Sequence, residues 1–196
     1  MKVLLLEIPS ANDAFEGRLV GNAIGEIFDL LKIEKTYKLI LSKKIFIKAI
    51  EDISYYDLIH IECHSDEEGI CYNPLRKKVI DWVTFAEILA KRNDLKAKQL
   101  VISGCLAGNI NSKAKALARR QSGFKRVFAF DEKIAYDKAI AVWSGFYYLL
   151  SESDQWSQEK IRSAIRKLRD CYNVKLVYFY HSSKKPSKEV IFPKKS

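Results

Sequence analysis

The chain has 196 residues, of which 48% are hydrophobic, and it carries a formal net charge of +10 at pH 7. This length suffices for one well-filled core and is short for two domains. No apolar run is long enough to cross a bilayer. The short apolar run near the N-terminus ends at Glu7, so we expect a first β-strand there and no signal peptide. Four cysteines without regular spacing argue against a disulfide framework, and we expect a cytoplasmic protein with reduced thiols.

The positive charge has two interpretations. Basic proteins often bind nucleic acid or anionic membranes. Here the lysines are spread along the chain, and their densest stretch, at residues 184–195, is accompanied by no aromatic-interleaved basic motif and no known nucleic-acid signature. We therefore favour a solvated basic surface, and a nucleic-acid partner remains open but is not favoured.

Predicted strands and helices alternate along the first part of the chain, which is typical of a βαβ architecture with a mostly parallel sheet. The first strand is expected at residues 2–8. Apolar residues then recur at helical spacing from Leu19 to Leu31, which predicts an amphipathic helix. A second strand, a short helix and a buried strand are expected at residues 37–41, 43–53 and 56–64.

The second part of the chain continues the alternation. Two short extended segments, at residues 70–72 and 78–81, flank the turn signal Asn73-Pro74 and predict a hairpin. Further helices are expected at residues 84–91, 113–122, 138–150 and 157–170, and further strands at 99–103, 126–130 and 175–180. We expect one domain over residues 1–181 and a basic, mobile tail over residues 182–196.

Two chemically reactive side chains come at the ends of buried strands. His64 ends one strand, and Cys105 follows another about 40 residues later. In an open α/β sheet, side chains just past the carboxyl ends of the strands line the functional crevice. A histidine beside a cysteine favours the nucleophilic thiolate and can protonate a leaving amine. The small residues Gly104 and Ser65 leave room for a substrate backbone, so the pair predicts acyl chemistry such as peptide-bond hydrolysis.

The residues around this pair resemble those of the caspase-like cysteine peptidases. Residues 64–70 read His-Ser-Asp-Glu-Glu-Gly-Ile, and residues 103–108 read Ser-Gly-Cys-Leu-Ala-Gly. Residues 116–118, 123–129 and 145–150 are similar to the helix, buried strand and Phe-Tyr helix of the CHAT branch, the group that also contains separase-like peptidases. The resemblance extends to about residue 180. It implies a caspase-like three-layer α/β sandwich, in which helices flank a mostly parallel central sheet and a small hairpin follows the histidine strand.

The resemblance also implies catalytic roles. Cys105 would be the nucleophile and His64 the general acid/base. The backbone N–H groups of Ser65 and Cys105 would form the oxyanion hole, although a glycine usually stands at the position of Ser65 in such families. Ser103, two positions before the cysteine, would line the pocket for the substrate side chain that precedes the cut, and its type indicates no preference.

Three acidic residues are further candidates for substrate binding. Asp131 and Glu132 follow a predicted strand, and Asp13 lies in the first loop after a strand, all at the same predicted edge of the sheet. Carboxylates there could hold an Arg or Lys of the substrate. The other interpretation is that each is a solvated loop carboxylate.

A metal site is a second chemical interpretation, because His60, Cys63, His64 and Cys71 are all ligand types. Adjacent strand residues point to opposite faces, so Cys63 and His64 cannot easily share a metal. There is also no paired CxxC or HExxH spacing. We therefore expect neither a metal nor another cofactor.

Two functions follow. The favoured one is a cysteine endopeptidase that acts on a protein or peptide and stays inactive until a separately encoded activator or sensor aligns the pair. CHAT-type peptidases are often fused to repeat-containing sensor regions, and none is found in this sequence, which suggests a bacterial defence or regulated-death system with a separate sensor. The alternative is a catalytically silent caspase-fold domain that binds a protein or nucleic acid through its basic surface.

Overall fold

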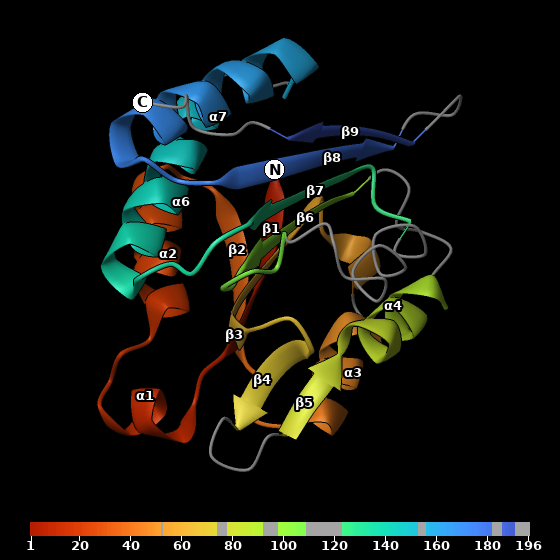
Figure 1. The fold of residues 1–196 in the computed structure, drawn as a ribbon. Helices are drawn as coiled ribbons and strands as arrows, with labels where there is room; N and C mark the ends of the chain where they lie inside the picture. Colours follow the sequence, from red (N-terminus) through yellow and green to blue (C-terminus); the bar gives the residue numbers. More distant parts are fainter. Residues whose placement is uncertain are drawn as a thin grey trace.

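A mixed β-sheet forms the centre of the computed structural model, which describes residues 1–51, 53–73, 78–91, 98–108, 123–152, 156–181 and 186–190 (Figure 1). The strand order is β2-β1-β3-β6-β7-β8-β9. The first five of these run parallel: β2 (Glu34–Leu39), β1 (Lys2–Ile8), β3 (Leu58–Ser65), β6 (Gln99–Ser103) and β7 (Arg126–Phe130). β8 (Leu176–His181) and β9 (Pro186–Val190) extend the sheet in antiparallel fashion.

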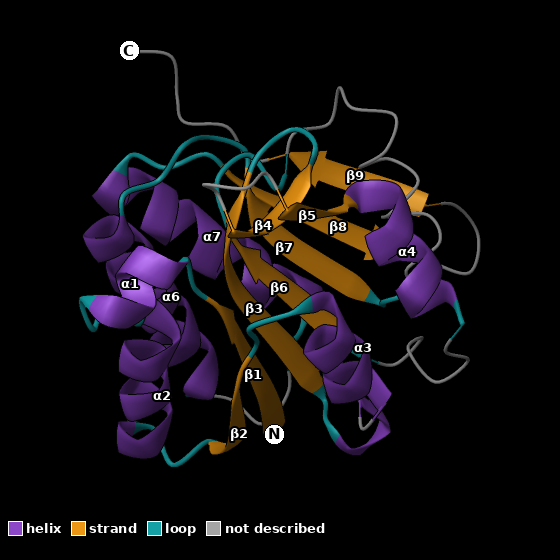
Figure 2. Ribbon diagram, turned by 90° about the horizontal axis from the view of Figure 1, so that it is seen from below, coloured by secondary structure: helices purple, strands orange, loops and turns teal. Residues whose placement is uncertain are grey.

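Helices cover both faces of this sheet, as Figure 2 shows. One face carries α2 (Val20–Leu30), α6 (Tyr136–Ser151) and α7 (Gln158–Tyr172), and the other carries α3 (Lys43–Glu51) and α4 (Trp82–Ala90). A short helix α1 (Ala11–Phe15) and a 3₁₀ turn (Ile53–Tyr55) lie in connections. The hairpin of β4 (Gly69–Asn73) and β5 (Lys78–Asp81) pairs with the end of β3. The predicted three-layer α/β arrangement, including this hairpin, is confirmed.

The central strands are buried on both faces because both faces are covered by helices. In β1, Val3 and Leu5 belong to the core beneath α2, α6 and α7, whereas Leu4 and Leu6 belong to the core beneath α3 and α4. Since side chains alternate along a strand, the even-numbered residues of β3 share the face covered by α2 and α6. His64 is therefore expected on the same face as His60 and Glu62.

Aromatic packing fixes the connection between β7 and α6. Trp143 and Phe146 on α6 are fully buried and contact each other edge to face, with ring centroids 5.5 Å apart. Phe128 and Phe130 of β7 pack against them at centroid distances of 5.0 Å. These contacts hold the N-terminus of α6, and the segment just before it, next to the end of β6.

Several predicted boundaries differ from the structure. β2 begins at Glu34 instead of Tyr37 and ends at Leu39, because its ladder with β1 runs from the pair Lys2–Glu34 to the pair Glu7–Leu39. Within the predicted tail, residues 186–190 form β9 against β8. The helix predicted at 113–122 lies outside the described residues.

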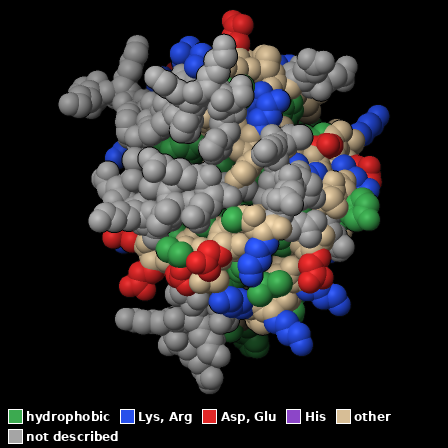
Figure 3. Space-filling model, turned by 90° about the vertical axis from the view of Figure 1, so that its right-hand side faces the viewer, with side chains coloured by type: hydrophobic (Ala, Val, Ile, Leu, Met, Phe, Trp, Pro, Cys, Tyr) green, Lys and Arg blue, Asp and Glu red, His purple; other side chains and the backbone are tan. Residues whose placement is uncertain are grey.

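Two surface observations complete the fold. On the face seen in Figure 3, the described Lys and Arg side chains lie among Asp and Glu side chains, a mixture typical of a solvated surface. In the part of the chain that the structure describes, no helix is long and apolar enough to cross a membrane.

Candidate active site

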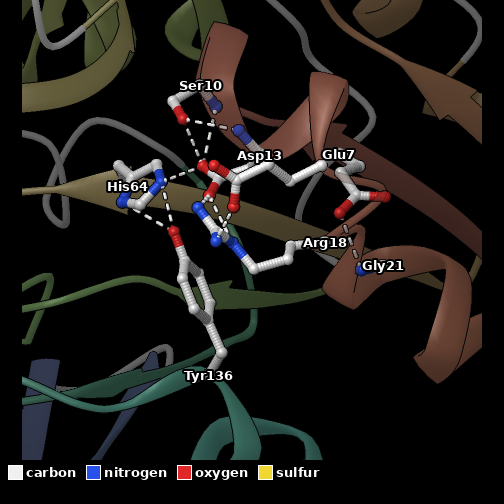
Figure 4. Close-up of polar contacts among 8 residues, drawn as sticks. Glu7, Ser10, Asp13, Arg18, Gly21, His64 and Tyr136 are labelled. Carbon is white, nitrogen blue, oxygen red and sulfur yellow. Dashed lines mark hydrogen bonds and ion pairs between the residues drawn. The ribbon is translucent and has the colours of Figure 1, made fainter.

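His64 lies at the carboxyl end of β3 and is held by two partners from distant parts of the chain (Figure 4). Its Nε2 atom is 2.6 Å from Oδ2 of Asp13, which precedes it by 51 positions. The same nitrogen is 2.5 Å from the hydroxyl oxygen of Tyr136, which follows it by 72 positions. The Tyr136 ring stands edge to face with the imidazole at a centroid distance of 5.5 Å. The imidazole is thus fixed from both sides.

Asp13 owes its position to the local structure of α1. Ser10 is the N-cap of this helix, and the pair forms a capping box: Asp13 N–H donates to Ser10 Oγ at 3.1 Å, and Ser10 N–H donates to Asp13 Oδ2 at 3.2 Å. Arg18 Nη2 lies 3.2 Å from the other carboxylate oxygen. One short polar helix therefore presents a buried carboxylate to His64.

The electrostatics of Asp13 favour its charged form. Burial alone would raise its pKa, but the hydrogen bond from Ser10, the hydrogen bond and charge of His64, and the contact with Arg18 together lower the pKa of Asp13 well below its usual range. An ionised Asp13 accepts from Nε2–H of His64, and this tautomer leaves Nδ1 as the basic nitrogen.

Cys105 follows directly on β6, and Gly104 allows this strand end to approach β3. A Cβ atom at Gly104 would lie 2.3 Å from Ser65 Oγ and 3.0 Å from the carbonyl oxygen of Cys63. The Ser65 hydroxyl donates to the carbonyl oxygen of Cys105 at 2.7 Å. The two residues predicted to form the oxyanion hole, Ser65 and Cys105, are therefore adjacent.

The Cys105 thiol faces the segment that leads from β7 into α6. The N–H of Ile134 donates to Cys105 Sγ at 3.4 Å, and the carbonyl oxygen of Ile134 lies 3.6 Å from the same sulfur atom. The next residue, Leu106, has a left-handed backbone (φ 57°), and its N–H donates to the carbonyl of Glu132 at 2.9 Å. The loop after β6 is thus fastened to the loop after β7.

His64 and Cys105 line one cavity of about 450 Å³, a size typical of ligand sites. The cavity lies where β3 and β6 end, next to the N-terminus of α6. Its described lining combines residues of these three elements: Glu62, Cys63, His64, Ser103, Gly104, Cys105, Ile134, Ala135, Tyr136, Asp137 and Ala139. Among the contacts of the described residues, no hydrogen bond joins His64 to Cys105.

A row of polar residues crosses the sheet just below this cavity. Glu7, Glu62 and Ser103 are in register on β1, β3 and β6 and share the face covered by α2 and α6. Glu7 accepts from Gly21 N–H at 2.9 Å and from the Tyr37 hydroxyl at 2.5 Å. Burial nevertheless raises the pKa of Glu7. This row follows apolar residues of the same face, such as Leu5 on β1 and Val101 on β6.

Glu62 and His60 form a buried pair within this layer. His60 Nδ1 is 2.6 Å from the Tyr147 hydroxyl, and His60 Nε2 is 3.4 Å from Glu62 Oε2. Burial lowers the pKa of His60 to about 3. Burial raises the pKa of Glu62 well above its usual range, the charge of Glu7 adds to this rise, and the nearby Ser103 hydroxyl partly opposes it. Burial thus disfavours the charged form of both residues.

The structure separates the predicted substrate-binding residues into two groups. Ser103 lines the cavity, and Asp13 lies next to His64. Asp131 and Glu132 line neither the cavity nor the small hollow beside Asp13. Glu132 Oε1 instead accepts from Lys175 N–H at 2.8 Å and so fastens the start of β8.

Sequence reasoning missed three residues of the site: Glu62, Ile134 and Tyr136. A signal for Glu62 existed, because a charged residue two positions before His64 in an apolar strand must share its face. Ile134 and Tyr136 gave no comparable signal, since their proximity to Cys105 and His64 depends on how α6 packs against the sheet.

Among the residues that the structure describes, no group of three or more His, Cys, Asp or Glu side chains is arranged to hold a metal ion. Cys63 packs in the core beneath α3 and α4, on the opposite face of β3 from His64.

No protein-family model and no curated protein sequence matches the chain. Solved structures do resemble it. The crystal structure of the Arg-specific cysteine proteinase gingipain R has a TM-score of 0.56 and 14% identity, covering 87% of this chain and 42% of that one. Separase, in the Saccharomyces cerevisiae separase–securin complex, has a TM-score of 0.53 and 11% identity, covering 86% of this chain and 10% of that one.

A protein of another class also shares the arrangement. A structure described as flavone reductase has a TM-score of 0.51 and 12% identity, covering 98% of this chain and 81% of that one. The similarities to gingipain R and separase identify the fold as caspase-like, and this chain spans less than half the length of either. At such identities the fold alone is shared, so the function must be inferred from the residues of the site.

Proposed function

We propose that this protein is a cysteine endopeptidase in which Cys105 is the nucleophile and His64 the general acid/base. One observation carries the proposal: both side chains line the same cavity, at the carboxyl ends of two neighbouring parallel strands. Functional groups of open α/β sheets gather at this edge. The fold shared with the cysteine proteinase gingipain R supports the same conclusion.

The proposed chemistry begins with proton transfer. Nδ1 of His64 takes the proton of the Cys105 thiol, and the thiolate attacks the carbonyl carbon of the peptide bond. The backbone N–H groups of Ser65 and Cys105 stabilise the resulting oxyanion. His64 returns its proton to the amine as the C–N bond breaks. A water molecule, deprotonated by His64, then attacks the thioester carbon. The C–S bond breaks, the acid product leaves, and the Cys105 thiolate takes the proton back from His64.

Asp13 has a positioning role in this proposal. Its ionised carboxylate at Nε2 orients the imidazole and stabilises the imidazolium that forms during each proton transfer. This role replaces the binding of a substrate cation by Asp13 that the sequence suggested. The protein would therefore use a Cys105–His64–Asp13 triad.

The same geometry supports a closed resting state. The backbone N–H of Ile134 donates a hydrogen bond to the Cys105 sulfur, and Tyr136 contacts the His64 imidazole. Both residues belong to one short segment before and at the start of α6. We propose that an activator, encoded separately, shifts this segment and lets His64 and Cys105 meet. A bacterial defence or regulated-death setting in the cytoplasm remains part of this proposal, on the sequence resemblance alone.

Alkylation of Cys105 tests the proposal without knowledge of the substrate. The rate of reaction with iodoacetamide is measured from pH 5 to 9 by peptide mass spectrometry, in proteins with and without His64→Ala. Each is also combined with Tyr136→Ala, which removes the contact that covers the imidazole. Cys171 is exposed and serves as an internal reference.

We expect Cys105 in the Tyr136→Ala protein to react at neutral pH at least tenfold faster than in the double variant with His64→Ala, because His64 promotes thiolate formation. Cys171 should react equally in all four proteins. If His64→Ala leaves the profile of Cys105 unchanged in both backgrounds, the pair does not form and the peptidase proposal is wrong. The silent caspase-fold domain would then be the better interpretation.

A further inference from the structure

We propose that Glu62 forms the base of a pocket for a cationic substrate side chain, an Arg or Lys at the residue preceding the cleaved bond. This inference rests on the proposed peptidase function and specifies the substrate class of the same site. It assigns specificity to a residue different from the loop carboxylates Asp131 and Glu132 that the sequence suggested.

The position of Glu62 relative to the reactive pair is the first support. Glu62 is on the same strand face as His64, two positions earlier, and in register with Ser103, which is two positions before Cys105. All four residues line the same cavity. A peptide whose carbonyl carbon lies at Cys105 can therefore direct the adjoining side chain down the cavity toward Glu62.

The charge of the cavity is the second support. Its described lining contains two carboxylates, Glu62 and Asp137, and neither Lys nor Arg. The whole chain, in contrast, has 34 Lys and Arg against 24 Asp and Glu. A basic protein that leaves its reactive cavity acidic is built to attract cations there and not elsewhere.

The third support is the small number of hydrogen-bond donors that the protein offers to Glu62. Glu62 is only 6% exposed, and its His60 contact is long, at 3.4 Å. The Ser103 hydroxyl is 1% exposed and lies beside Glu62, where it partly opposes the rise of the Glu62 pKa. Buried acceptors without good donors are costly. A guanidinium or ammonium group supplies three to five N–H donors and would satisfy both residues.

The remaining walls suit a long cationic side chain. Ile134, Ala135 and Ala139 add apolar surface to the lining of the same cavity. Lys and Arg pack their methylene stems on such surface while the charged head reaches a polar partner. The neighbouring His60 is neutral, so it does not neutralise Glu62, and an entering cation shifts the Glu62 carboxyl toward its ionised form.

A binding experiment tests this inference independently of catalysis. The probes are butylguanidinium and its uncharged analogue N-butylurea, titrated into Cys105→Ala protein and followed through the backbone amide signals of residues 103–105 and 134–137. The C105A change removes any dependence on the nucleophile. The same titration is repeated with Glu62→Gln added, and with Glu132→Gln as a matched control outside the cavity.

We expect butylguanidinium to bind at least tenfold more tightly than N-butylurea. Glu62→Gln should reduce that preference to less than twofold, and Glu132→Gln should leave it intact. Equal affinity of the two probes, or a preference that survives Glu62→Gln, would overturn the assignment. Thermal melting of each variant establishes that it is folded.

The two proposals can fail separately. Loss of the butylguanidinium preference with normal His64-dependent alkylation of Cys105 would leave a peptidase of different specificity. A cation preference that depends on Glu62, in a protein whose Cys105 shows no His64 dependence, would leave a cation-binding site without peptidase chemistry.

Discussion

The two faces of the central sheet use the same strands in different ways. Beneath α3 and α4 the residues of β1 stay apolar to its carboxyl end, as in Leu4, Leu6 and Ile8. Beneath α2 and α6 the residues of β3 begin apolar and end polar, as in Leu58, His60, Glu62 and His64. Because residues alternate between faces, one strand can supply both a dry core and a reactive cavity. Both faces hold a buried core, and the face beneath α2 and α6 also holds groups that are unfavourable to bury and useful for chemistry.

The largest expected effect is on the apolar face. Phe46 on α3 is fully buried and stacks on Phe85 at a centroid distance of 5.8 Å. We expect Phe46→Ala to lower the free energy of unfolding by about 3–5 kcal/mol, because it removes a large side chain and leaves a cavity. Urea denaturation measures the loss. Ile47→Ala, at a neighbouring residue that is 40% exposed, should cost about 1 kcal/mol or less. Similar losses for the two variants would contradict the role of Phe46 in the buried core of this face.

The second prediction concerns Glu62 on the polar face. Burial raises its pKa in the folded protein, so the unfolded chain releases this proton first as the pH rises above about 4.3. Stability is therefore lost with rising pH, and glutamine has no proton to lose. We expect Glu62→Gln to increase the free energy of unfolding at pH 7, with the gain disappearing near pH 4.

Urea denaturation at several pH values measures this gain. Asp137→Asn, at an exposed carboxylate of the same cavity, is the control and should change stability little. A Glu62→Gln protein that is no more stable at pH 7 than at pH 4, relative to wild type, would show that Glu62 is well accommodated. The polar face would then carry no stability cost at this residue.

The third prediction uses His60, whose pKa is lowered to about 3 by burial. The unfolded chain protonates this imidazole below about pH 6.5 and the folded chain does not, so stability falls as the pH falls through this range. We expect wild type to lose about 2 kcal/mol more than His60→Gln between pH 7 and pH 5. Between pH 8 and pH 7 the free energies of unfolding of the two proteins, measured by urea denaturation, should change by the same amount. Parallel curves down to pH 5 would mean that His60 is charged in the folded protein.

The smallest expected effect concerns Tyr136, which covers His64. Tyr136→Phe removes a hydroxyl hydrogen bond worth about 1 kcal/mol. We expect the alkylation rate of Cys105 at pH 7 to rise by about fivefold, because the segment of Ile134 and Tyr136 opens more often. Tyr148→Phe, at an exposed tyrosine on the same helix, should leave the rate unchanged. A rate that falls in Tyr136→Phe would indicate that the hydroxyl supports reactivity instead of restraining it.

The sequence predicted which strands form the centre of the sheet better than it predicted where individual strands begin and end. The apolar runs of β1, β3, β6 and β7 were long enough to define buried strands, and the turn signal after β4 defined the hairpin. β2 was placed too late, because its limits follow from pairing with β1 and not from its own half-exposed residues. β9 was missed, because an edge strand of Pro, Ser, Lys and Glu has no apolar pattern and depends on the partner strand β8.

Within the candidate site, sequence by itself determined which side chains stand at strand ends: His64 at the end of β3 and Cys105 after β6. That follows from local hydrophobic patterning, which ends where a strand leaves the core. Only the tertiary structure decided what meets them: Asp13 at the imidazole, Ile134 at the sulfur, and Glu62 beneath both. Those contacts join residues 29 to 51 positions apart or depend on sheet register, and both are set by the packing of helices on the sheet, which no local pattern encodes.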